Sequence, residues 1–209
     1  MAFAIRLAGG RDAAAVARIY RGSVETSPST FELQPPPVEE MARRIEDTLR
    51  AYPWIVAERD GVVVGYAYAA RHRVRIGYQW SVETSVYVDE GSRGGRVGKA
   101  LYTSLCRILR AQGLFNAYAG ITLPNPASVA LHESVGFEFF AVYRNVGYKF
   151  GRWHHVGWWA LTLAPHRDEP PPPLELSAVQ RRPDWSDLLA AGESLVASPP
   201  GPDPKGSDP

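Results

Sequence analysis

A basic, glycine-rich turn between a strand pattern and a helix pattern most constrains how this chain can fold. Residues 82–102 read VETSVYVDEGSRGGRVGKALY, so alternating apolar positions lead through a glycine pair into a helix. Main-chain N–H groups converge at such a helix N-terminus, and the helix dipole adds positive potential. Arg93, Arg96 and Lys99 add side-chain charge. The turn therefore predicts a site for a pyrophosphate.

A second strand and a second helix follow this turn. Residues 123–137 read LPNPASVALHESVGF, where Asn125 opens a helix pattern that Gly136 closes. His132 lies seven residues after Asn125, about two helical turns, so the two side chains share one helix face. The order strand, helix, strand, helix, strand predicts a mixed α/β sheet.

The rest of residues 1–163 extends this pattern into one domain. Asp60-Gly61 is a favoured two-residue turn and predicts a hairpin, whereas the proline-rich residues 27–37 predict a loop. About seven strands and about four helices are expected. The strands are residues 3–7, 54–58, 62–70, 80–88, 116–121, 137–146 and 158–163, and the helices are residues 11–25, 38–50, 97–112 and 126–135.

Charge and cysteine content exclude several kinds of site. The net charge is +1, so the overall charge favours neither nucleic acid nor an anionic membrane as a partner. Cys106 is the only cysteine, which rules out an intramolecular disulfide and a multi-cysteine metal site. A buried, inert thiol is the expected state of Cys106. His154 and His155 are adjacent, so their rings diverge and no metal site is expected.

The two ends of the chain differ in composition. The N-terminus lacks the basic-then-apolar order of a signal peptide, and no apolar run approaches about 18–20 residues, so a cytoplasmic protein is expected. Eleven of the 18 prolines lie in residues 164–209. That segment is predicted to be mostly extended or disordered, with one possible short helix over 186–195 (SDLLAAGESL) that packs on the body of the protein or on a neighbour.

The segment from Glu83 to Phe137 resembles the acetyl-CoA core of the GNAT N-acetyltransferases. Their turn reads (Gln/Arg)-x-x-Gly-x-(Gly/Ala), in which Arg93 and Gly98 fill the ends and Arg96 replaces the first glycine. Within the family the chain is most similar to the phosphinothricin and methionine-sulfoximine acetyltransferases. VETSPSTF (24–31), GYQWSVETSVYV (77–88) and GYKFGRWHHVGWW (147–159) are among the matching pieces, and the likeness spans roughly residues 3–163. It implies the GNAT fold, acetyl-CoA as co-substrate and a homodimer.

The resemblance also implies which residues bind acetyl-CoA. The strand stretch that pairs with the pantetheine arm is Val86, Tyr87 and Val88, and a main-chain N–H there meets the oxyanion. The pyrophosphate lies over Arg93, Gly94, Gly95, Arg96, Val97, Gly98 and Lys99, and Asn125 and Ser128 also contact the cofactor. If the position of Arg96 requires a positive φ, the strain is of order 1 kcal/mol. In that case Gly94 and Gly95 are expected to make the close approach.

Glu83 and His132 are the two catalytic candidates. Strand alternation puts Glu83, Ser85 and Tyr87 on the face opposite Val82 and Thr84, and Glu83 precedes the pantetheine stretch by three residues. The resemblance implies that Glu83 is the general base, and a salt-bridged strand glutamate is the plainer alternative. His132 stands where the family often has the tyrosine that protonates the leaving thiolate. A structural histidine is the alternative for that position.

Five residues are implied for the acceptor site. Arg73 and Arg75, two apart in the sequence, predict an anion clamp if they share one strand face, although protective charge on an edge strand explains them equally well. Phe31 and Tyr78 match pocket positions of the family, and Tyr87 is expected to contact substrate across a subunit boundary.

The sequence thus predicts an enzyme that transfers acetyl directly to the α-amine of a small anionic amino acid. Phosphinothricin and methionine sulfoximine or sulfone are the expected acceptors, and no residue resembles an activated nucleophile for an acyl-enzyme. Two alternatives stay open. One is an acetyltransferase for protein N-termini or lysines, and the other is a non-catalytic acyl-CoA-binding module, for which the arginine at position 96 is the one supporting feature.

Overall fold

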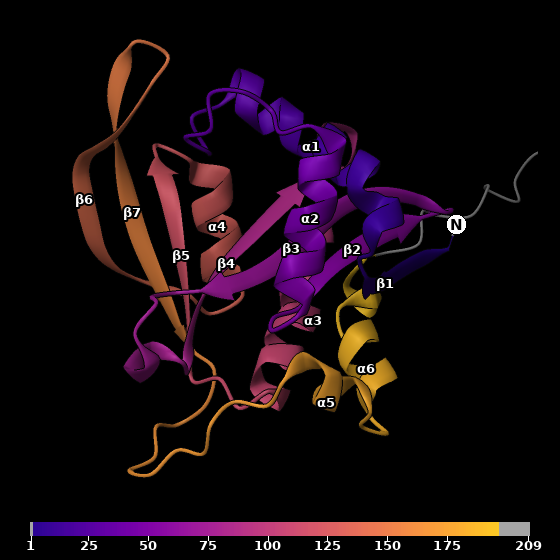
Figure 1. The fold of residues 1–209 in the computed structure, drawn as a ribbon. Coiled ribbons are helices and arrows are strands. Elements are labelled where there is room, and N and C mark those ends of the chain that lie inside the picture. The colour runs from indigo at the N-terminus through magenta and orange to yellow at the C-terminus, as the bar shows by residue number, and fades with distance from the viewer. Residues whose placement is uncertain (1, 197–209) are drawn as a thin grey trace, which may run out of the picture.

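The computed structural model describes residues 2–196 as one seven-stranded sheet with helices against both faces (Figure 1). The strand order is β1-β2-β3-β4-β5-β7-β6, and neighbours are antiparallel except for the parallel pair β4 and β5. The strands are β1 (Phe3–Leu7), β2 (Trp54–Arg59), β3 (Val62–Arg71), β4 (Ser81–Val88), β5 (Asn116–Leu123), β6 (Glu138–Lys149) and β7 (Arg152–Thr162). The helices are α1 (Ala13–Thr26), α2 (Val38–Leu49), α3 (Val97–Ala111), α4 (Pro126–Ser134), α5 (Leu176–Gln180) and α6 (Trp185–Ala190).

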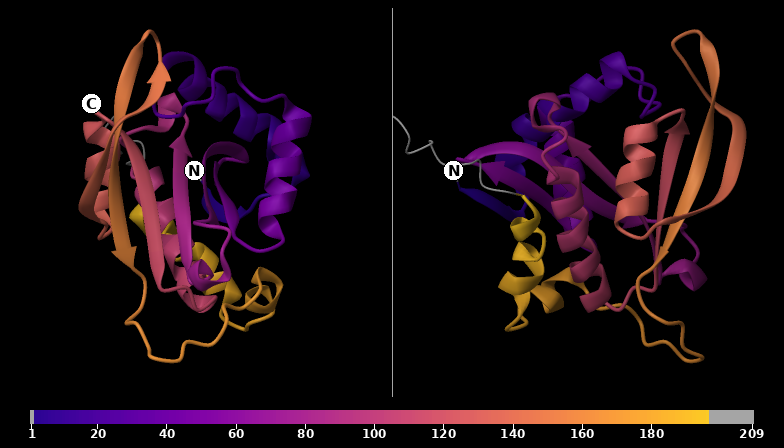
Figure 2. Two further views of the ribbon diagram at one scale, coloured as in Figure 1. Left: turned by 60° about the vertical axis from the view of Figure 1, so that its left-hand side comes forward. Right: turned by 180° about the vertical axis from the view of Figure 1, so that it is seen from behind.

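Two hydrophobic clusters hold the helices to the sheet, with α1 and α2 on one face and α3 and α4 on the other (Figure 2). On the α3 face, Leu101 and Leu105 are fully buried against Val82 of β4. On the α1 and α2 face, Ile45 packs with Tyr66 of β3. The predicted alternation of β4 is confirmed, because the β3–β4 register runs without a bulge. Within residues 2–196, none of the helices has the length and apolar character needed to cross a membrane.

The sheet contains two hairpins closed by the same kind of turn. Asp60 and Gly61 both have positive φ, +50° and +79°, so the predicted hairpin of β2 and β3 is confirmed. Phe150 and Gly151 have φ of +51° and +74° and join β6 to β7. The predicted start of the last strand at residue 158 was wrong by six residues, because the polar run from Arg152 concealed its first half.

The connection between β3 and β4 also differs from the prediction. Arg73 and Arg75 were expected on one strand face, but β3 ends at Arg71. Residues 72–80 instead form an irregular connection that includes a 3-10 helix at Ile76–Tyr78. Both interpretations of Arg73 and Arg75, an anion clamp and protective charge on an edge strand, assumed a β-strand at these residues, and the structure has none there.

In the segment expected to be mostly extended or disordered, residues 164–175 contain no helix or strand, whereas residues 176–196 are largely helical and include the region where a short helix was expected. α6 and a 3-10 turn at Glu193–Leu195 pack against α3 and β1 (Figure 1), and Leu176 and Val179 of α5 are buried. The Ser104 hydroxyl of α3 donates to Leu189 O at 2.6 Å. The expected helix over 186–195 is α6 plus the 3-10 turn. Residues 197–209 of the predicted tail lie outside the described residues.

Candidate active site

β4 and β5 separate in the middle of the sheet (Figure 1). Their pairing is limited to Ser81–Glu83 of β4 and Asn116–Tyr118 of β5, while β3 pairs with β4 as far as Val88. Main-chain groups on the β5 side of residues 84–88 are therefore at a strand edge. An extended chain with amide groups can pair with such an edge. The predicted pantetheine stretch, Val86 to Val88, lies on it.

The predicted anion turn lies at the end of β4 and leads into α3. Arg93, Gly94, Gly95 and Arg96 are exposed, Lys99 is half-buried, and Val97 and Gly98 are buried. A Cβ placed on Gly98 would lie 2.8 Å from Cδ2 of Leu131, so this glycine allows α4 to approach the start of α3. Three exposed or half-exposed cations thus surround the N-terminus of a 15-residue helix.

Arg96 has the left-handed backbone that its position requires. It is the N-cap of α3 with φ of +60°, and no side chain caps the helix there. Gly94 also has a positive φ, +80°, as expected for the close approach, whereas Gly95 does not. Arg96 therefore has the positive φ on which the expected strain depended, so its backbone holds strain of order 1 kcal/mol.

Glu83 lies at the point where β4 leaves β5. Its Oε1 accepts hydrogen bonds from His72 Nδ1 at 2.9 Å and from Arg73 Nη1 at 3.2 Å. The His72 ring stacks on Tyr118 of β5, with 4.6 Å between ring centroids. About a third of the Glu83 side chain is exposed, so the carboxylate is oriented by its neighbours and still open to a ligand.

The two predicted clamp arginines have different surroundings. Arg73 is directed at Glu83, and its charge is matched there. Arg75 is exposed at the start of the 3-10 helix, followed by Tyr78, whose ring lies 5.9 Å from that of His72. Arg73 is therefore engaged at Glu83, whereas Arg75 forms no ion pair within residues 2–196.

His132 is buried and bonded through both ring nitrogens. Nδ1 lies 2.7 Å from Ser128 O, which only an N–H can satisfy, so Nε2 accepts from the Tyr102 hydroxyl at 2.8 Å. Burial lowers the pKa of His132, which favours the neutral ring. Nε2 then has no proton to donate. The arrangement supports a positioning role better than the predicted acid role.

Asn125 is the N-cap residue of α4. Its Oδ1 accepts from the Ser128 main-chain N–H at 3.1 Å, and the Ser128 hydroxyl lies 3.4 Å from His132 Nδ1. Asn125, Ser128 and His132 therefore share one helix face, as predicted.

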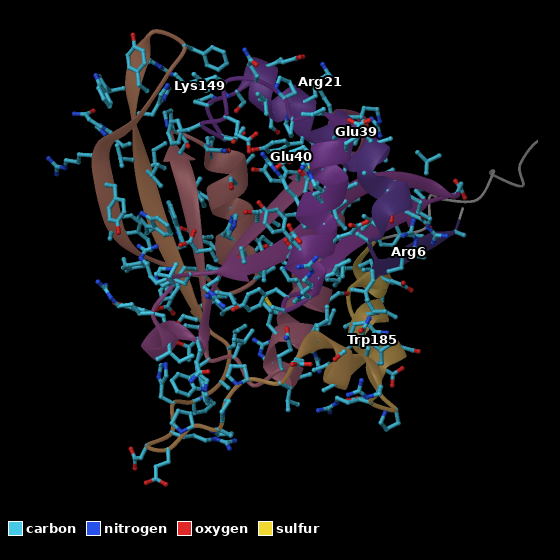
Figure 3. The ribbon with its side chains drawn as sticks, in the orientation of Figure 1. Arg6, Arg21, Glu39, Glu40, Lys149 and Trp185 are labelled. Atoms are coloured by element: carbon cyan, nitrogen blue, oxygen red, sulfur yellow. The ribbon has the colours of Figure 1, made fainter. Side chains whose placement is uncertain are left out.

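Phe31 is held at the tip of the β6–β7 hairpin. A Cβ on Gly147 would lie 2.2 Å from the Phe31 ring, so glycine is required where this ring crosses β6. Lys149, buried at the hairpin end, donates from Nζ to Ser27 O at 3.0 Å and Thr30 O at 2.8 Å (Figure 3). These contacts fix the loop between α1 and α2 over the Glu83 face of the sheet.

Tyr87 is part of an aromatic cluster on that same face. Its ring lies 5.2 Å from Tyr66 and 5.1 Å from Tyr20, and burial raises its pKa well above the usual value. The Tyr87 ring is therefore packed within its own chain, and its contact with substrate across a subunit boundary stays a prediction.

His72, Tyr118 and Lys149 were not predicted as site residues. In the β3–β4 register Ala70 lies opposite Glu83, so the next residues of the chain come within reach of the carboxylate. Knowledge of the β3–β4 register would therefore have indicated His72 and Arg73 as neighbours of Glu83. The connection of nine residues is too long for the sequence to assign that register, because short turns alone fix it.

Comparisons with known proteins identify the family. The family described as acetyltransferase (GNAT) domain matches residues 5–158. Phosphinothricin N-acetyltransferase of Streptomyces viridochromogenes is 42% identical over 155 residues, which are 74% of this chain and 85% of that protein. L-methionine sulfoximine/L-methionine sulfone acetyltransferase of Pseudomonas aeruginosa is 35% identical, over 81% of this chain and 100% of that protein.

Two solved structures show the same fold with acetyl-CoA bound. One is a phosphinothricin acetyltransferase from Sinorhizobium meliloti, with a TM-score of 0.77, 33% identity and coverage of 84% of this chain and 99% of that one. The other is yncA from Salmonella typhimurium, with a TM-score of 0.78, 34% identity and coverage of 82% and 99%. The separated strands, the basic turn and these likenesses together establish that the chain belongs to the GNAT acetyltransferases and is an N-acetyltransferase.

Proposed function

We propose that the enzyme transfers the acetyl group of acetyl-CoA to the α-amine of a small anionic amino acid. Phosphinothricin and methionine sulfoximine or sulfone are the first candidates, since relatives are named for them. The observation that most supports this is the Glu83 carboxylate, oriented by His72 and Arg73 beside the free edge of β4. A base at this position is next to the thioester end of a pantetheine arm that lies along the free edge of β4.

The cofactor is proposed to bind along β4 and over α3. The edge of residues 84–88 offers main-chain partners for the pantetheine amides, and Arg93, Arg96 and Lys99 offer charge to the pyrophosphate. Asn125 and Ser128 lie on the facing helix α4. These residues fit an extended acyl-CoA whose anionic part lies at the helix N-terminus.

The proposed chemistry is direct transfer. Glu83 accepts the ammonium proton, directly or through a water, and the free amine attacks the thioester carbonyl carbon. A main-chain N–H in residues 86–88 stabilises the oxyanion, then the carbon–sulfur bond breaks, and the proton that the attacking nitrogen still has to lose passes to the departing thiolate. His132 orients Tyr102 behind β4, where the Tyr102 hydroxyl also lies 3.4 Å from Thr84 Oγ1.

We also propose a cytoplasmic homodimer. The outer strands of the sheet expose a run of aromatic side chains, each with 46–60% of its surface accessible, which a partner subunit would cover. These side chains are Phe139, Phe140, Tyr143, Tyr148, Phe150 and Trp153. Analytical ultracentrifugation of the parent and of Tyr143→Asp tests this, and a parent that sediments as a monomer at micromolar concentration contradicts it.

A thiol-release assay tests the function. The panel contains phosphinothricin, methionine sulfone, other amino acids, a peptide with a free N-terminus and a lysine peptide. Release with anionic amino acids supports the proposal, whereas faster release with either peptide favours a protein acetyltransferase. Acetyl-CoA binding without release for any amine favours the non-catalytic module.

Arg75 tests the charge preference. Because Arg73 is already paired with Glu83, Arg75 is the proposed partner for the anionic group of the acceptor. Arg75→Ala should raise KM for an acidic acceptor by about 10-fold or more, as expected for a lost charge-assisted contact, and leave KM for its amide nearly unchanged. Equal effects on both acceptors would return Arg75 to a surface role.

A further inference from the structure

The phosphate end of the proposed acetyl-CoA site lies next to the β2–β3 hairpin. Two side chains from the first turn of α3 pack over Gly65 of β3, where an added Cβ would lie 3.2 Å from Val97 Cγ1 and 3.3 Å from Leu101 Cδ1. The start of α3 therefore lies against the half of β3 that leads out of the hairpin. Side chains at the end of β2 can for this reason reach the turn that precedes α3.

Arg59, the last residue of β2, lies at this turn. A Cβ added to Gly95 would lie 3.6 Å from Arg59 Nη2, so the guanidinium is beside the residue that precedes the α3 N-cap. Arg59 is half-buried, yet it takes part in none of the ion pairs formed within residues 2–196. Removing a charge from water costs free energy that a counter-charge normally offsets. The position of Arg59 therefore indicates an anion from outside the chain.

The electrostatics of the turn point the same way. Arg59 adds a fourth positive charge, from a separate segment, to the three cations within residues 93–99. The first turn of α3 has no acidic residue, and its N-cap side chain makes no capping hydrogen bond. Of the preceding carboxylates, Asp89 is paired with a cation of α1, and the exposed Glu90 forms no ion pair within the described part of the chain. Four like charges at the positive end of a helix dipole repel one another unless an anion binds among them.

The place of Arg59 relative to α3 indicates which phosphate group it contacts. The pyrophosphate is proposed to lie at the main-chain N–H groups where α3 begins, whereas Arg59 lies beside Gly95, before the N-cap. Because consecutive Cα atoms are about 3.8 Å apart, an anion on Arg59 is displaced by one or two residue spacings from those N–H groups. The second anionic group of acetyl-CoA is the 3′-phosphate, a monoester with a charge of about −1.5 to −2 at pH 7, and one ribose ring separates it from the pyrophosphate.

We propose that Arg59 is a further cofactor-binding residue and that it binds the 3′-phosphate of acetyl-CoA. The proposal rests on the proposed function, because it takes acetyl-CoA as the co-substrate and the α3 turn as the place of its pyrophosphate. A planar guanidinium can donate two parallel N–H bonds to one phosphate group. The enzyme should therefore distinguish CoA from dephospho-CoA, which has a hydroxyl group in place of the 3′-phosphate.

Calorimetry of CoA and dephospho-CoA binding tests this without any acetyl transfer. Arg59→Gln removes the charge, and Arg59→Lys keeps the charge without the two parallel donors. Arg107→Gln is the matched control, because Arg107 is exposed on α3 and lies eleven residues after the N-cap, about 16 Å along the helix. At about 0.1 M salt, charges at that distance are largely screened. The Tm of each variant without ligand shows whether it is folded.

The parent should bind CoA about 10-fold or more tightly than dephospho-CoA, the scale of a charge-assisted contact. Arg59→Gln should weaken CoA binding by about 10-fold or more and change dephospho-CoA binding by less than about twofold, and Arg59→Lys should keep part of the CoA affinity. Arg107→Gln should bind both ligands as the parent does. Equal weakening for both ligands in Arg59→Gln would place Arg59 at the pyrophosphate and overturn the proposal, as would unchanged binding of both. An equal loss in Arg107→Gln would overturn it too, because net charge would then be the cause. A parent that binds neither ligand would overturn the proposed function as well.

Discussion

The two sides of β4 are built in different ways. On the proposed cofactor side, the consecutive residues 93–99 form one turn that supplies the glycines, the helix N-terminus and three cationic side chains. On the proposed acceptor side, Glu83 accepts from His72, the His72 ring stacks on Tyr118 of β5, and Lys149 of the β6–β7 hairpin holds the loop of Phe31. A site built from the main chain of consecutive residues needs only a short motif. A site built from side chains of separate segments needs the whole fold to bring them together. Substitutions on the two sides should therefore affect different kinetic constants.

Glu83→Gln should produce the largest difference between the effect on turnover and the effect on acetyl-CoA binding. The amide keeps shape and most hydrogen bonding but removes basicity, so kcat should fall roughly 10²–10³-fold, the usual scale for loss of a general base. Acetyl-CoA affinity should stay unchanged, and raising the pH from 6 to 9.5 should partly restore the rate by supplying free amine. Steady-state kinetics across that range measure this. Parental kcat with the same pH profile would remove Glu83 from the mechanism.

Gly95→Asp tests the cofactor side. Gly95 is exposed, and an added Cβ would lie 3.4 Å from Ser92 O, so the fold should tolerate a side chain. The new carboxylate should weaken acetyl-CoA binding by about 10–100-fold through repulsion of the pyrophosphate, with acceptor KM unaffected at saturating acetyl-CoA. Calorimetry and the shift of Tm by acetyl-CoA measure this. Gly95→Ser is the control for size. An equal loss in both variants would mean that charge is not the cause.

Lys149→Met is expected to have a smaller effect, confined to the acceptor. Loss of the donors to Ser27 O and Thr30 O should release the loop of Phe31 and raise acceptor KM by about 10-fold. Acetyl-CoA affinity should not change. Lys149→Arg should restore part of the KM because it keeps a charged donor, and Arg152→Met is a control on the same hairpin. A change in kcat with unchanged KM would contradict this role.

The smallest effect concerns His132 and pH. Its pKa is lowered in the folded state, so the unfolded chain binds more protons and stability falls as pH drops below about 6.5. His132→Gln should remove that part of the pH dependence, at most about 1 kcal/mol between pH 7 and 5.5. Urea unfolding of both proteins at these pH values measures the difference. Parallel curves would show that His132 does not titrate in this range.

How much of the structure could be predicted from the sequence depends on the same difference between local motifs and contacts of separate segments. The Asp60-Gly61 hairpin, the Arg93 to Lys99 turn and the Asn125 helix are local patterns, and the structure contains all three. The hairpin at Phe150 was misplaced because a turn whose first residue is aromatic gives no local signal for a positive φ. The helix expected over 186–195 is present, but α5 was not predicted because its buried residues, Leu176 and Val179, are too few for a helical period.

At the site, residue types are easier to predict from the sequence than their partners. Glu83 and His132 were singled out, but their contacts to His72 and Tyr102 depend on strand register and helix packing. The acid role of His132 was inferred from position alone. The hydrogen bond to Ser128 O determines which ring nitrogen holds the proton, and only the folded chain shows it.

The contact between β1 and the segment after α6 sets a timing requirement on folding. The Ile5 N–H donates to Glu193 Oε1 at 2.7 Å across 188 positions of the chain, and a Cβ on Gly192 would overlap Ala100 O at 1.9 Å. At about 5–20 residues per second, a ribosome makes Glu193 about 10–40 s after Ile5. Until then the outer edge of β1 lacks its cover, and an uncovered strand edge is where chains associate with one another. Any change that delays the docking of this segment should therefore reduce the yield of soluble protein before it alters catalysis.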